Sequence, residues 1–181
     1  MGYGEIGRRI GSILEAMSIK IKAIQRNPER DSVSDIHEPD ELRDLLPNTD
    51  ILILAVPLTQ ETESLIGEEE LSLLPDLAIL VNISRGIVVD QEALYEALKE
   101  RRLFAAGMDV WYNYPADRQS RSETFPGDFP FHKLDNLVFS PHRAGLVRET
   151  ETLRMRALAD LLNAAARNQQ LQNEVDLDLG Y

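Results

Sequence analysis

Three glycines, Gly2, Gly4 and Gly7, stand in a GxGxxG spacing with only Met1 ahead of them. This spacing is typical of a tight turn that opens a helix and lets the pyrophosphate of a dinucleotide approach the backbone. In dinucleotide-binding folds a central strand leads into the turn. We therefore expect a sheet that lacks its first strand, and weak cofactor binding because nothing anchors the turn at Gly2.

The composition limits the possible partners. The 181 residues include 19 Lys and Arg against 31 Asp and Glu, a formal net charge of −12, which opposes binding to nucleic acid or an anionic membrane. We expect neither as a partner, and we expect a cytoplasmic location because no secretory signal pattern is present. With no cysteine and three scattered histidines, we expect no disulfide, cysteine nucleophile or metal site.

Apolar periodicity predicts alternating strands and helices. Apolar residues from Ile6 to Met17 recur at intervals of three and four, which predicts a helix with one buried stripe. The continuous apolar run 51–56, closed by Pro57, is typical of a parallel strand buried on both faces. The same reasoning predicts further strands over 19–24, 78–82, 103–110 and 137–139, and further helices over 39–46, 64–74, 90–101 and 148–168. The predicted fold class is α/β, a Rossmann-like, doubly wound and mostly parallel sheet with helices on both faces.

The residues between these predicted strands and helices are also informative. Asp90 is the expected N-cap of the helix over 90–101, and the proline-rich stretch 112–132 is expected to be a long loop. A turn is expected at residues 26–28, and the tail 174–181 is expected to be frayed. His37, in an acidic loop, and His132, in the long loop, are expected on the surface.

Five motifs follow one another along the chain. They are GxGxxG, Val56–Thr59 with Thr62, Asn82–Gly86 with Val89–Asp90, Gly107–Val110, and Ser140–His142 with Gly145. Together they resemble the D-isomer-specific 2-hydroxyacid dehydrogenases over nearly the whole chain. The resemblance implies an oxidoreductase that transfers hydride between NAD or NADP and a small 2-keto or 2-hydroxy acid.

The same resemblance implies how the chain is organised. Residues 1–146 correspond to a dinucleotide-binding domain that is incomplete at its N-terminus. Residues 147–181 correspond to a helix and tail that return toward a substrate domain absent from this chain. Family members dimerise through the dinucleotide-binding domain, so a homodimer is expected here.

The resemblance assigns the catalytic roles to two residues. Arg85 stands where the family places the arginine that holds the substrate carboxylate and polarises its carbonyl, a task suited to a planar guanidinium. His142 stands at the family's acid/base position. The third family position, usually a glutamate, is Tyr114, and a neutral phenol cannot keep an imidazole protonated as a carboxylate does. Glu123 or Asp128 in the long loop are alternatives for that carboxylate.

Cofactor choice depends on the end of the strand that follows the glycine turn. An NAD enzyme commonly has an acidic residue there, whereas this chain has Gln25 followed by Arg26, which favours the 2′-phosphate of NADP. We therefore expect NADP or NAD as the cofactor, with NADP favoured. The full set of cofactor-binding residues implied by the resemblance is Gly2, Gly4, Glu5, Ile6, Gly7, Gln25, Arg26, Val56, Pro57, Thr62, Ile83, Ser84, Arg85, Asp109, His142 and Gly145.

Two other functions remain open at this point. The chain could be a noncatalytic module that binds a nucleotide or a protein through the same fold, or an inactive fragment with no ligand. Tyr114 and the absent substrate domain favour these alternatives, whereas the presence of both Arg85 and His142 favours the dehydrogenase.

Overall fold

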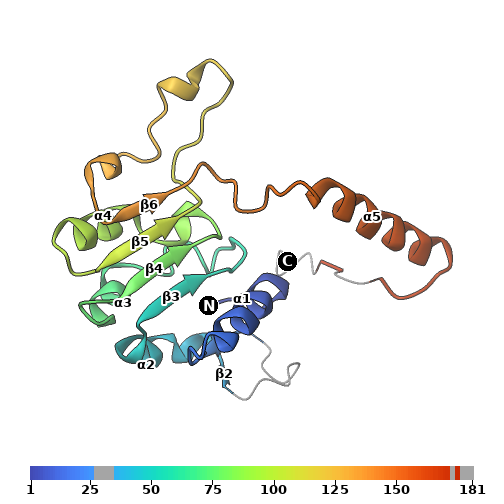
Figure 1. The fold of residues 1–181 in the computed structure, drawn as a ribbon, viewed down its shortest axis with the longest axis horizontal. Helices are drawn as coiled ribbons and strands as arrows, with labels where there is room; N and C mark the ends of the chain where they lie inside the picture. The colour runs from blue at the N-terminus through green and yellow to red at the C-terminus, as the bar shows by residue number, and fades with distance from the viewer. Residues whose placement is uncertain (27–34, 172–173, 176–181) are drawn as a thin grey trace. The chain divides into compact units, whose positions relative to one another are not determined.

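The computed structural model describes residues 1–26, 35–171 and 174–175, and Figure 1 shows its strands and helices. The chain divides into two compact units, Met1–Pro141 and His142–Tyr181. Asn27 and Pro28 of the expected turn, and most of the expected frayed tail, lie outside the described residues. None of the described helices is long and apolar enough to span a lipid bilayer.

A parallel sheet of four strands forms the centre of the first unit. Its strands, in spatial order, are β3 (Ile51–Leu54), β4 (Ile79–Asn82), β5 (Ala105–Met108) and β6 (Leu137–Phe139). Every neighbouring pair is parallel, which confirms the predicted α/β class. The prediction that the run from Ile51 is buried on both faces is wrong at its first residue, because Ile51 is 40% exposed at the edge of this sheet. Leu54 and Leu80 on neighbouring strands are fully buried. β6 has the predicted bounds, whereas β3, β4 and β5 are shorter than predicted because the apolar runs extend past the paired residues into the adjoining connections.

A second, two-stranded parallel sheet consists of β1 (Ala23–Ile24) and β2 (Ile36–His37). The predicted strand over 19–24 is therefore wrong over residues 19–22, where the Ile19 N–H bonds to the Leu14 carbonyl oxygen instead of a strand. Sequence reasoning missed β2 because it is two residues long and shows no alternation of apolar and polar side chains.

Helices and short 3-10 turns connect the strands. The helices of the first unit are α1 (Glu5–Ala16), α2 (Leu42–Leu45), α3 (Glu68–Leu73) and α4 (Gln91–Lys99). The short turns are Pro39–Glu41, Leu46–Asn48, Gly86–Val88, Ser120–Ser122 and Phe131–Lys133. The predicted N-cap is confirmed, since the Asp90 Oδ1 atom accepts a hydrogen bond of 2.8 Å from the Ala93 N–H. The predicted long loop is confirmed, with only two of these short turns inside it.

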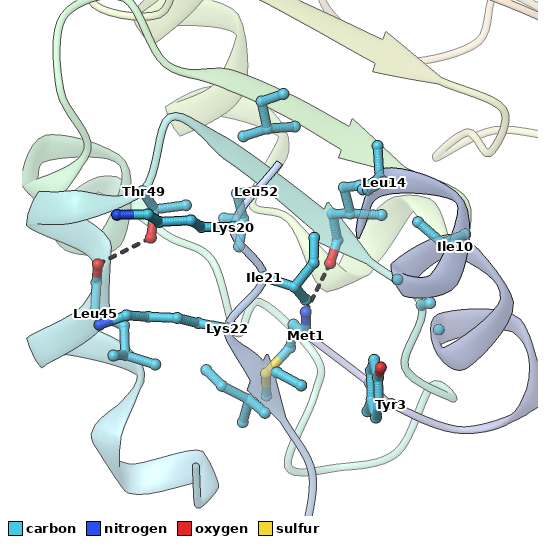
Figure 2. Close-up of a pocket in the computed structure, with 18 of the residues that line it drawn as sticks. Met1, Tyr3, Ile10, Leu14, Lys20, Ile21, Lys22, Leu45, Thr49 and Leu52 are labelled. Atoms are coloured by element: carbon cyan, nitrogen blue, oxygen red, sulfur yellow. Dashed lines mark hydrogen bonds between the residues drawn. The ribbon is translucent and has the colours of Figure 1, made fainter. Parts of the chain in front are cut away.

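The apolar stripe predicted on α1 is only partly covered. Ile6, Ile13 and Met17 are 63%, 50% and 65% exposed, and Gly11 is the one buried residue of the helix. The expected single buried stripe is therefore wrong. A helix buries its apolar face only against a packed neighbour, and no described strand fills the space between β1 and β3 that this helix borders (Figure 2).

The second unit contains α5 (Thr150–Ala166), which agrees with the helix predicted over 148–168. The Thr150 hydroxyl donates to the Gly145 carbonyl oxygen at 2.9 Å and accepts from the Val147 N–H at 3.1 Å, so it fixes the turn before the helix. Several large apolar side chains of α5 are about half exposed, among them Leu153, Met155, Leu158 and Leu162.

His37 is not a loop surface residue as expected, because it belongs to β2 and its side chain is only 21% exposed. Its Nδ1 atom lies 3.0 Å from a Glu41 oxygen and its Nε2 atom 2.8 Å from an Asp35 oxygen. The hydrogen bond to Glu41, with a contribution from Asp35, raises the pKa of His37 above 6.5. His132 is exposed, as expected, and stacks on Phe125.

The raised His37 pKa predicts a pH-dependent stability. The protonated form is favoured by folding, so its contribution is complete below the unfolded value of 6.5 and is lost as the pH rises through the higher folded pKa. The free energy of unfolding of the native protein minus that of His37→Gln should therefore fall as pH rises above 6.5. Urea unfolding of both proteins from pH 5.5 to pH 9 measures this difference, and a difference that stays flat would contradict it.

Candidate cofactor and substrate site

The ends of the four parallel strands bring the predicted site residues to one edge of the sheet. The register pairs Leu54 with Asn82, Asn82 with Met108, and Met108 with Phe139. The residues that follow these strands therefore lie side by side at the carboxyl edge. They include Val56, Pro57, Ile83, Ser84, Arg85 and Asp109, all of which the sequence assigned to the site. The carboxyl edge of a parallel sheet is where ligands bind in open α/β folds.

The glycine turn is attached to the same edge. The Ala55 N–H donates to the Met1 carbonyl oxygen at 2.9 Å, and the Gly2 N–H donates to the Ile24 carbonyl oxygen at 2.9 Å. The expectation that nothing anchors the turn at Gly2 is therefore wrong, because its backbone is held between β1 and β3. The expectation of weak cofactor binding rested on an unanchored turn and therefore loses its support.

Two of the glycines are required by close backbone contacts. Gly2 has a φ of +85°, and a Cβ there would lie 2.6 Å from the Ala55 carbonyl oxygen. A Cβ on Gly7 would lie 2.1 Å from the Gly2 carbonyl oxygen, so the first turn of α1 packs directly on the loop. Any side chain at either position would displace backbone.

The start of α1 is open to a ligand. Gly4 is the N-cap, no described side chain caps the helix, and a Cβ on Gly4 would meet no described heavy atom within 4 Å. The unpaired N–H groups of the first turn and the helix dipole favour an anion at this point. This backbone cradle fits the pyrophosphate of a dinucleotide, with Glu5 and Ile6 in the helix turn that borders it.

Buried Asn82 fixes the turn that carries Arg85. Its Oδ1 atom accepts hydrogen bonds from the Ser84 N–H at 3.0 Å and the Ser84 hydroxyl at 2.9 Å. Its Nδ2 atom donates to the Arg85 carbonyl oxygen at 2.9 Å. The sequence motif contained Asn82 but gave it no role. The sequence feature that could have indicated this role was an amide side chain at the end of an otherwise apolar strand.

Arg85 is exposed at this edge and extends beyond the buried turn. Its Nη1 atom donates to the Ser84 carbonyl oxygen at 2.6 Å, and no carboxylate of the described residues pairs with it. A Cβ on the next residue, Gly86, would lie 2.3 Å from the Trp111 carbonyl oxygen, which holds the turn tightly against the end of β5. Arg85 thus offers guanidinium donors to a carboxylate or a carbonyl oxygen.

Asp109 is a buried carboxylate with a polar neighbour at the end of a strand. The residue is 8% exposed, and the Ser140 hydroxyl donates a short hydrogen bond to its Oδ1 atom. The Trp111 Nε1–H donates to the Ser140 carbonyl oxygen at 2.9 Å. The ends of β5 and β6 are thereby joined beside the turn that carries Arg85.

Tyr114, at the position usually taken by glutamate, makes a hydrogen bond that stabilises the local turn. The Tyr114 hydroxyl accepts a hydrogen bond of 3.0 Å from the Trp111 N–H and closes the turn after β5. Asp128, one alternative carboxylate, accepts from Asn113 at 2.9 Å and from Gln91 at 3.2 Å, and these bonds lower its pKa. Asp128 therefore holds the long loop to the start of α4. Glu123, the other alternative, is exposed at the end of a short 3-10 turn.

Thr62 and Arg26 border the outer part of the site. The Thr62 hydroxyl donates to the Pro57 carbonyl oxygen at 2.7 Å, which closes the loop after β3. Gln25 and Arg26 follow β1, and the Gln25 N–H donates to the His37 carbonyl oxygen at 3.1 Å. Arg26 forms an ion pair with Glu61 from the same loop as Thr62. Arg26, the residue predicted to bind the 2′-phosphate of NADP, is therefore already paired with a carboxylate.

His142 and Gly145 belong to the second unit. His142 is exposed and has a φ of +55°, a backbone conformation that few residues other than glycine adopt. The Gly145 carbonyl oxygen accepts the hydrogen bond from the Thr150 hydroxyl in the turn before α5. The first unit thus unites Arg85, Asp109 and the glycine turn at one edge, while His142 begins the segment that follows the last strand.

A family comparison identifies this arrangement. The model of the D-isomer specific 2-hydroxyacid dehydrogenase NAD binding domain matches residues 1–144. The chain belongs to this family. The Rossmann-like parallel fold with helices on both faces, which the sequence predicted, is confirmed as the fold of a 2-hydroxyacid dehydrogenase NAD binding domain.

The chain is also similar in sequence and in fold to individual members of the family. The glyoxylate reductase of Korarchaeum cryptofilum is 36% identical over 182 residues, which cover 99% of this chain and 52% of that protein. The probable 2-hydroxyacid dehydrogenase of Rhizobium etli CFN 42, solved with NADP, HEPES and L(+)-tartaric acid, is 25% identical with a TM-score of 0.84 over 100% of this chain and 55% of that one. The NAD-complexed D-isomer specific 2-hydroxyacid dehydrogenase of Lactobacillus delbrueckii ssp. bulgaricus is 28% identical with a TM-score of 0.79 over 97% of this chain and 54% of that one. The chain spans about half the length of these dehydrogenases.

Proposed function

We propose that this chain provides the nicotinamide dinucleotide site of an oxidoreductase that reduces a small 2-keto acid to a 2-hydroxy acid. The observation that carries the proposal is the common carboxyl edge, where the register brings together the glycine turn, Arg85 and Asp109. The bare N-terminus of α1 offers N–H donors to the pyrophosphate. When bound, the nicotinamide supplies the hydride.

Arg85 and His142 would then act on the substrate. Arg85 would hold the carboxylate and polarise the carbonyl of the 2-keto acid through paired N–H donors. His142 would donate the proton that the developing alkoxide needs. Its left-handed backbone supports the assignment, because strained conformations are concentrated at functional positions. With Tyr114 bonded to the Trp111 backbone, no carboxylate at the usual glutamate position supports the imidazolium.

The test of this function is turnover. Glyoxylate and hydroxypyruvate are supplied separately with NADH and with NADPH, and the loss of absorbance of the reduced cofactor is followed. We expect oxidation of the cofactor that requires the keto acid. Cofactor binding without turnover of either acid would support the second candidate, a noncatalytic nucleotide-binding module. The hydrogen bond of Tyr114 to the backbone is the observation that favours that candidate.

We also propose that NADP(H) is preferred over NAD(H). The support is the Gln25 and Arg26 pair at the end of β1, where a carboxylate would repel a 2′-phosphate and a guanidinium attracts it. The solved relatives include one complex with NADP and one with NAD, so both cofactors occur among proteins of this fold.

The cofactor preference predicts the behaviour of two variants. Arg26→Ala should weaken NADPH binding by about 10-fold or more, as expected for a lost charge-assisted hydrogen bond, and should leave NADH binding unchanged. Glu61→Gln removes the anion that pairs with Arg26 and should strengthen NADPH binding. Quenching of the single tryptophan, Trp111, measures each affinity. Equal losses for both cofactors in Arg26→Ala would contradict the assignment.

The proposed site also suggests a role for each part of the chain. We propose that residues 1–146 serve as the dinucleotide-binding domain and that residues 147–181 lead toward a substrate domain. We propose a homodimer, which the exposed apolar side chains of α5 support, and separately a cytoplasmic location. Light scattering across a range of protein concentrations tests the dimer.

A further inference from the structure

Ser140 follows β6 at the carboxyl edge of the sheet and stands two residues before His142. Its N–H donates to the Met108 carbonyl oxygen at 3.0 Å, and its hydroxyl donates to the Asp109 carboxylate. Its carbonyl oxygen accepts from the Trp111 Nε1–H at 2.9 Å. All three partners belong to the end of β5 and the turn after it, and β5 lies beside β6 in Figure 1. The N–H, the hydroxyl and the carbonyl of Ser140 are therefore all bonded to the end of one neighbouring strand.

The Trp111 side chain that makes the third of these bonds is packed among aromatic rings. The residue is 8% exposed. Its ring lies 5.5 Å from the Phe139 ring and 6.5 Å from the Phe131 ring between centroids, with interplanar angles of 85° and 63°. Edge-to-face contacts of this kind favour one orientation of an aromatic ring. The indole N–H is therefore aimed at Ser140 by packing that does not depend on the hydrogen bond.

The backbone of Trp111 is held from another side. Its N–H donates to the Tyr114 hydroxyl at 3.0 Å. Its carbonyl oxygen lies against Gly86, where an added Cβ would approach it to 2.3 Å. Because Gly86 directly follows Arg85, Trp111 contacts the Arg85 turn with its carbonyl group and the end of β6 with its indole. One residue thus joins the turn that carries Arg85 to the segment that leads to His142.

The indole bond acts on a peptide group that has little remaining freedom. The Ser140 carbonyl belongs to the planar peptide that joins Ser140 to Pro141, so the bond fixes the orientation of that plane. A residue before proline is confined to extended backbone, and the proline ring fixes φ near about −65°. Between the bonded carbonyl and the His142 Cα, only the ψ angle of Pro141 can turn. The orientation of this one peptide therefore largely decides where His142 begins.

We propose that Trp111 is a positioning residue for His142, because its indole N–H orients the Ser140–Pro141 peptide and so places the imidazole for proton donation. The inference rests on the proposed dehydrogenase function, in which His142 donates the proton. Proton transfer requires placement within hydrogen-bond reach of the atom that is protonated. Loss of the indole bond should therefore slow the chemical step. It should not weaken cofactor binding, since the glycine turn is anchored on β1 and beside β3.

The experiment compares four forms of the full chain. The first is the chain itself, and the second is Trp111→Phe, which keeps an aromatic ring and loses the N–H. In the third, the tryptophan is replaced by benzothienylalanine, an analogue of the same shape with sulfur in place of the N–H. Because the sequence contains one tryptophan, biosynthetic incorporation of the analogue changes this position alone. The fourth form is Phe131→Leu, the matched control, which removes packing against the indole and keeps the donor.

The order parameter of the His142 amide, from backbone nitrogen relaxation, reports the positioning and needs no turnover. We expect about 0.85 in the chain itself and in Phe131→Leu, and below about 0.6 in the two forms without the donor. With glyoxylate and NADPH, those two forms should lose about 10-fold in kcat and keep both KM values within about twofold. Phe131→Leu should lower Tm and keep kcat within about twofold at a temperature where it is folded.

A rigid His142 amide in both forms without the donor overturns the proposal, as does an equal loss of order in Phe131→Leu. A His142 amide that is already mobile in the chain itself also overturns it. Absence of turnover in all four forms counts against the dehydrogenase function, whereas the order parameters still decide whether Trp111 positions His142.

Discussion

Replacing Arg85 with glutamine is expected to lower kcat/KM for glyoxylate reduction with NADPH by about 10²-fold or more. Glutamine keeps a polar side chain at the exposed position but loses the positive charge and the paired donors that stabilise a developing oxyanion. The Arg85→Lys variant should recover only part of the loss, because an ammonium group lacks the planar fork. Steady-state kinetics with varied glyoxylate measure both effects.

Arg101→Gln is the matched control for Arg85. Arg101 is exposed, pairs with Asp135 and lies between α4 and β5, at the amino edge of the sheet. Its replacement should leave kcat/KM within about twofold, since exposed ion pairs contribute little. A similar loss in Arg85→Gln and Arg101→Gln, or full activity of Arg85→Gln, would contradict the substrate role of Arg85.

Asn82→Leu is expected to cost stability and site geometry together. The replacement leaves the buried Ser84 N–H and the Arg85 carbonyl oxygen without the partners that Asn82 supplies. Buried polar groups left unpaired cost about 1–3 kcal/mol each, so a loss of about 3 kcal/mol and a Tm lower by about 6–12 °C are expected. At a temperature where the variant is still folded, NADPH affinity should also fall, because Ser84 and Arg85 lose their fixed turn.

Asn136→Leu separates the loss of stability from the loss of site geometry. Asn136 is also buried, and its Nδ2 atom donates to the Leu98 carbonyl oxygen at 3.0 Å, but it precedes β6 at the amino edge of the sheet. Its loss should lower Tm and leave the NADPH affinity of the folded protein unchanged. If both asparagine variants change affinity by the same factor at matched stability, the positioning role of Asn82 is wrong.

The sequence predicted the edge of the sheet well because the relevant signals are local. Buried parallel strands appear as continuous apolar runs, and the residue after each run must lie at the carboxyl edge whatever the rest of the chain does. Arg85 and Asp109 were assigned to the site through the family motifs, and both follow such runs, while Asp90 was identified from its position before an amphipathic run. The strand over 137–139 was predicted with the observed bounds for the same reason.

The remaining features depend either on contacts between distant segments or on local side-chain contacts that periodicity and motifs do not specify. The exposure of Ile6 and Ile13 follows from the space between β1 and β3, which helical periodicity alone does not reveal. His37 bonds to Asp35 and Glu41, two and four residues away, and its strand pairing with β1 is a contact across the sequence that periodicity does not reveal. Tyr114 bonds to a backbone N–H three residues earlier, a turn contact that the family pattern for a glutamate did not suggest.

A nicotinamide dinucleotide must bind at the carboxyl edge of the sheet if this chain provides the cofactor site. Amide chemical shifts recorded during an NADPH titration test this most directly. The amides of Gly4 to Gly7, Ser84 and Asp109 should shift with a common saturation curve, while those of Asp50 and Asn136 at the opposite edge stay fixed. Shifts confined to the opposite edge, or none at millimolar NADPH, would contradict the account.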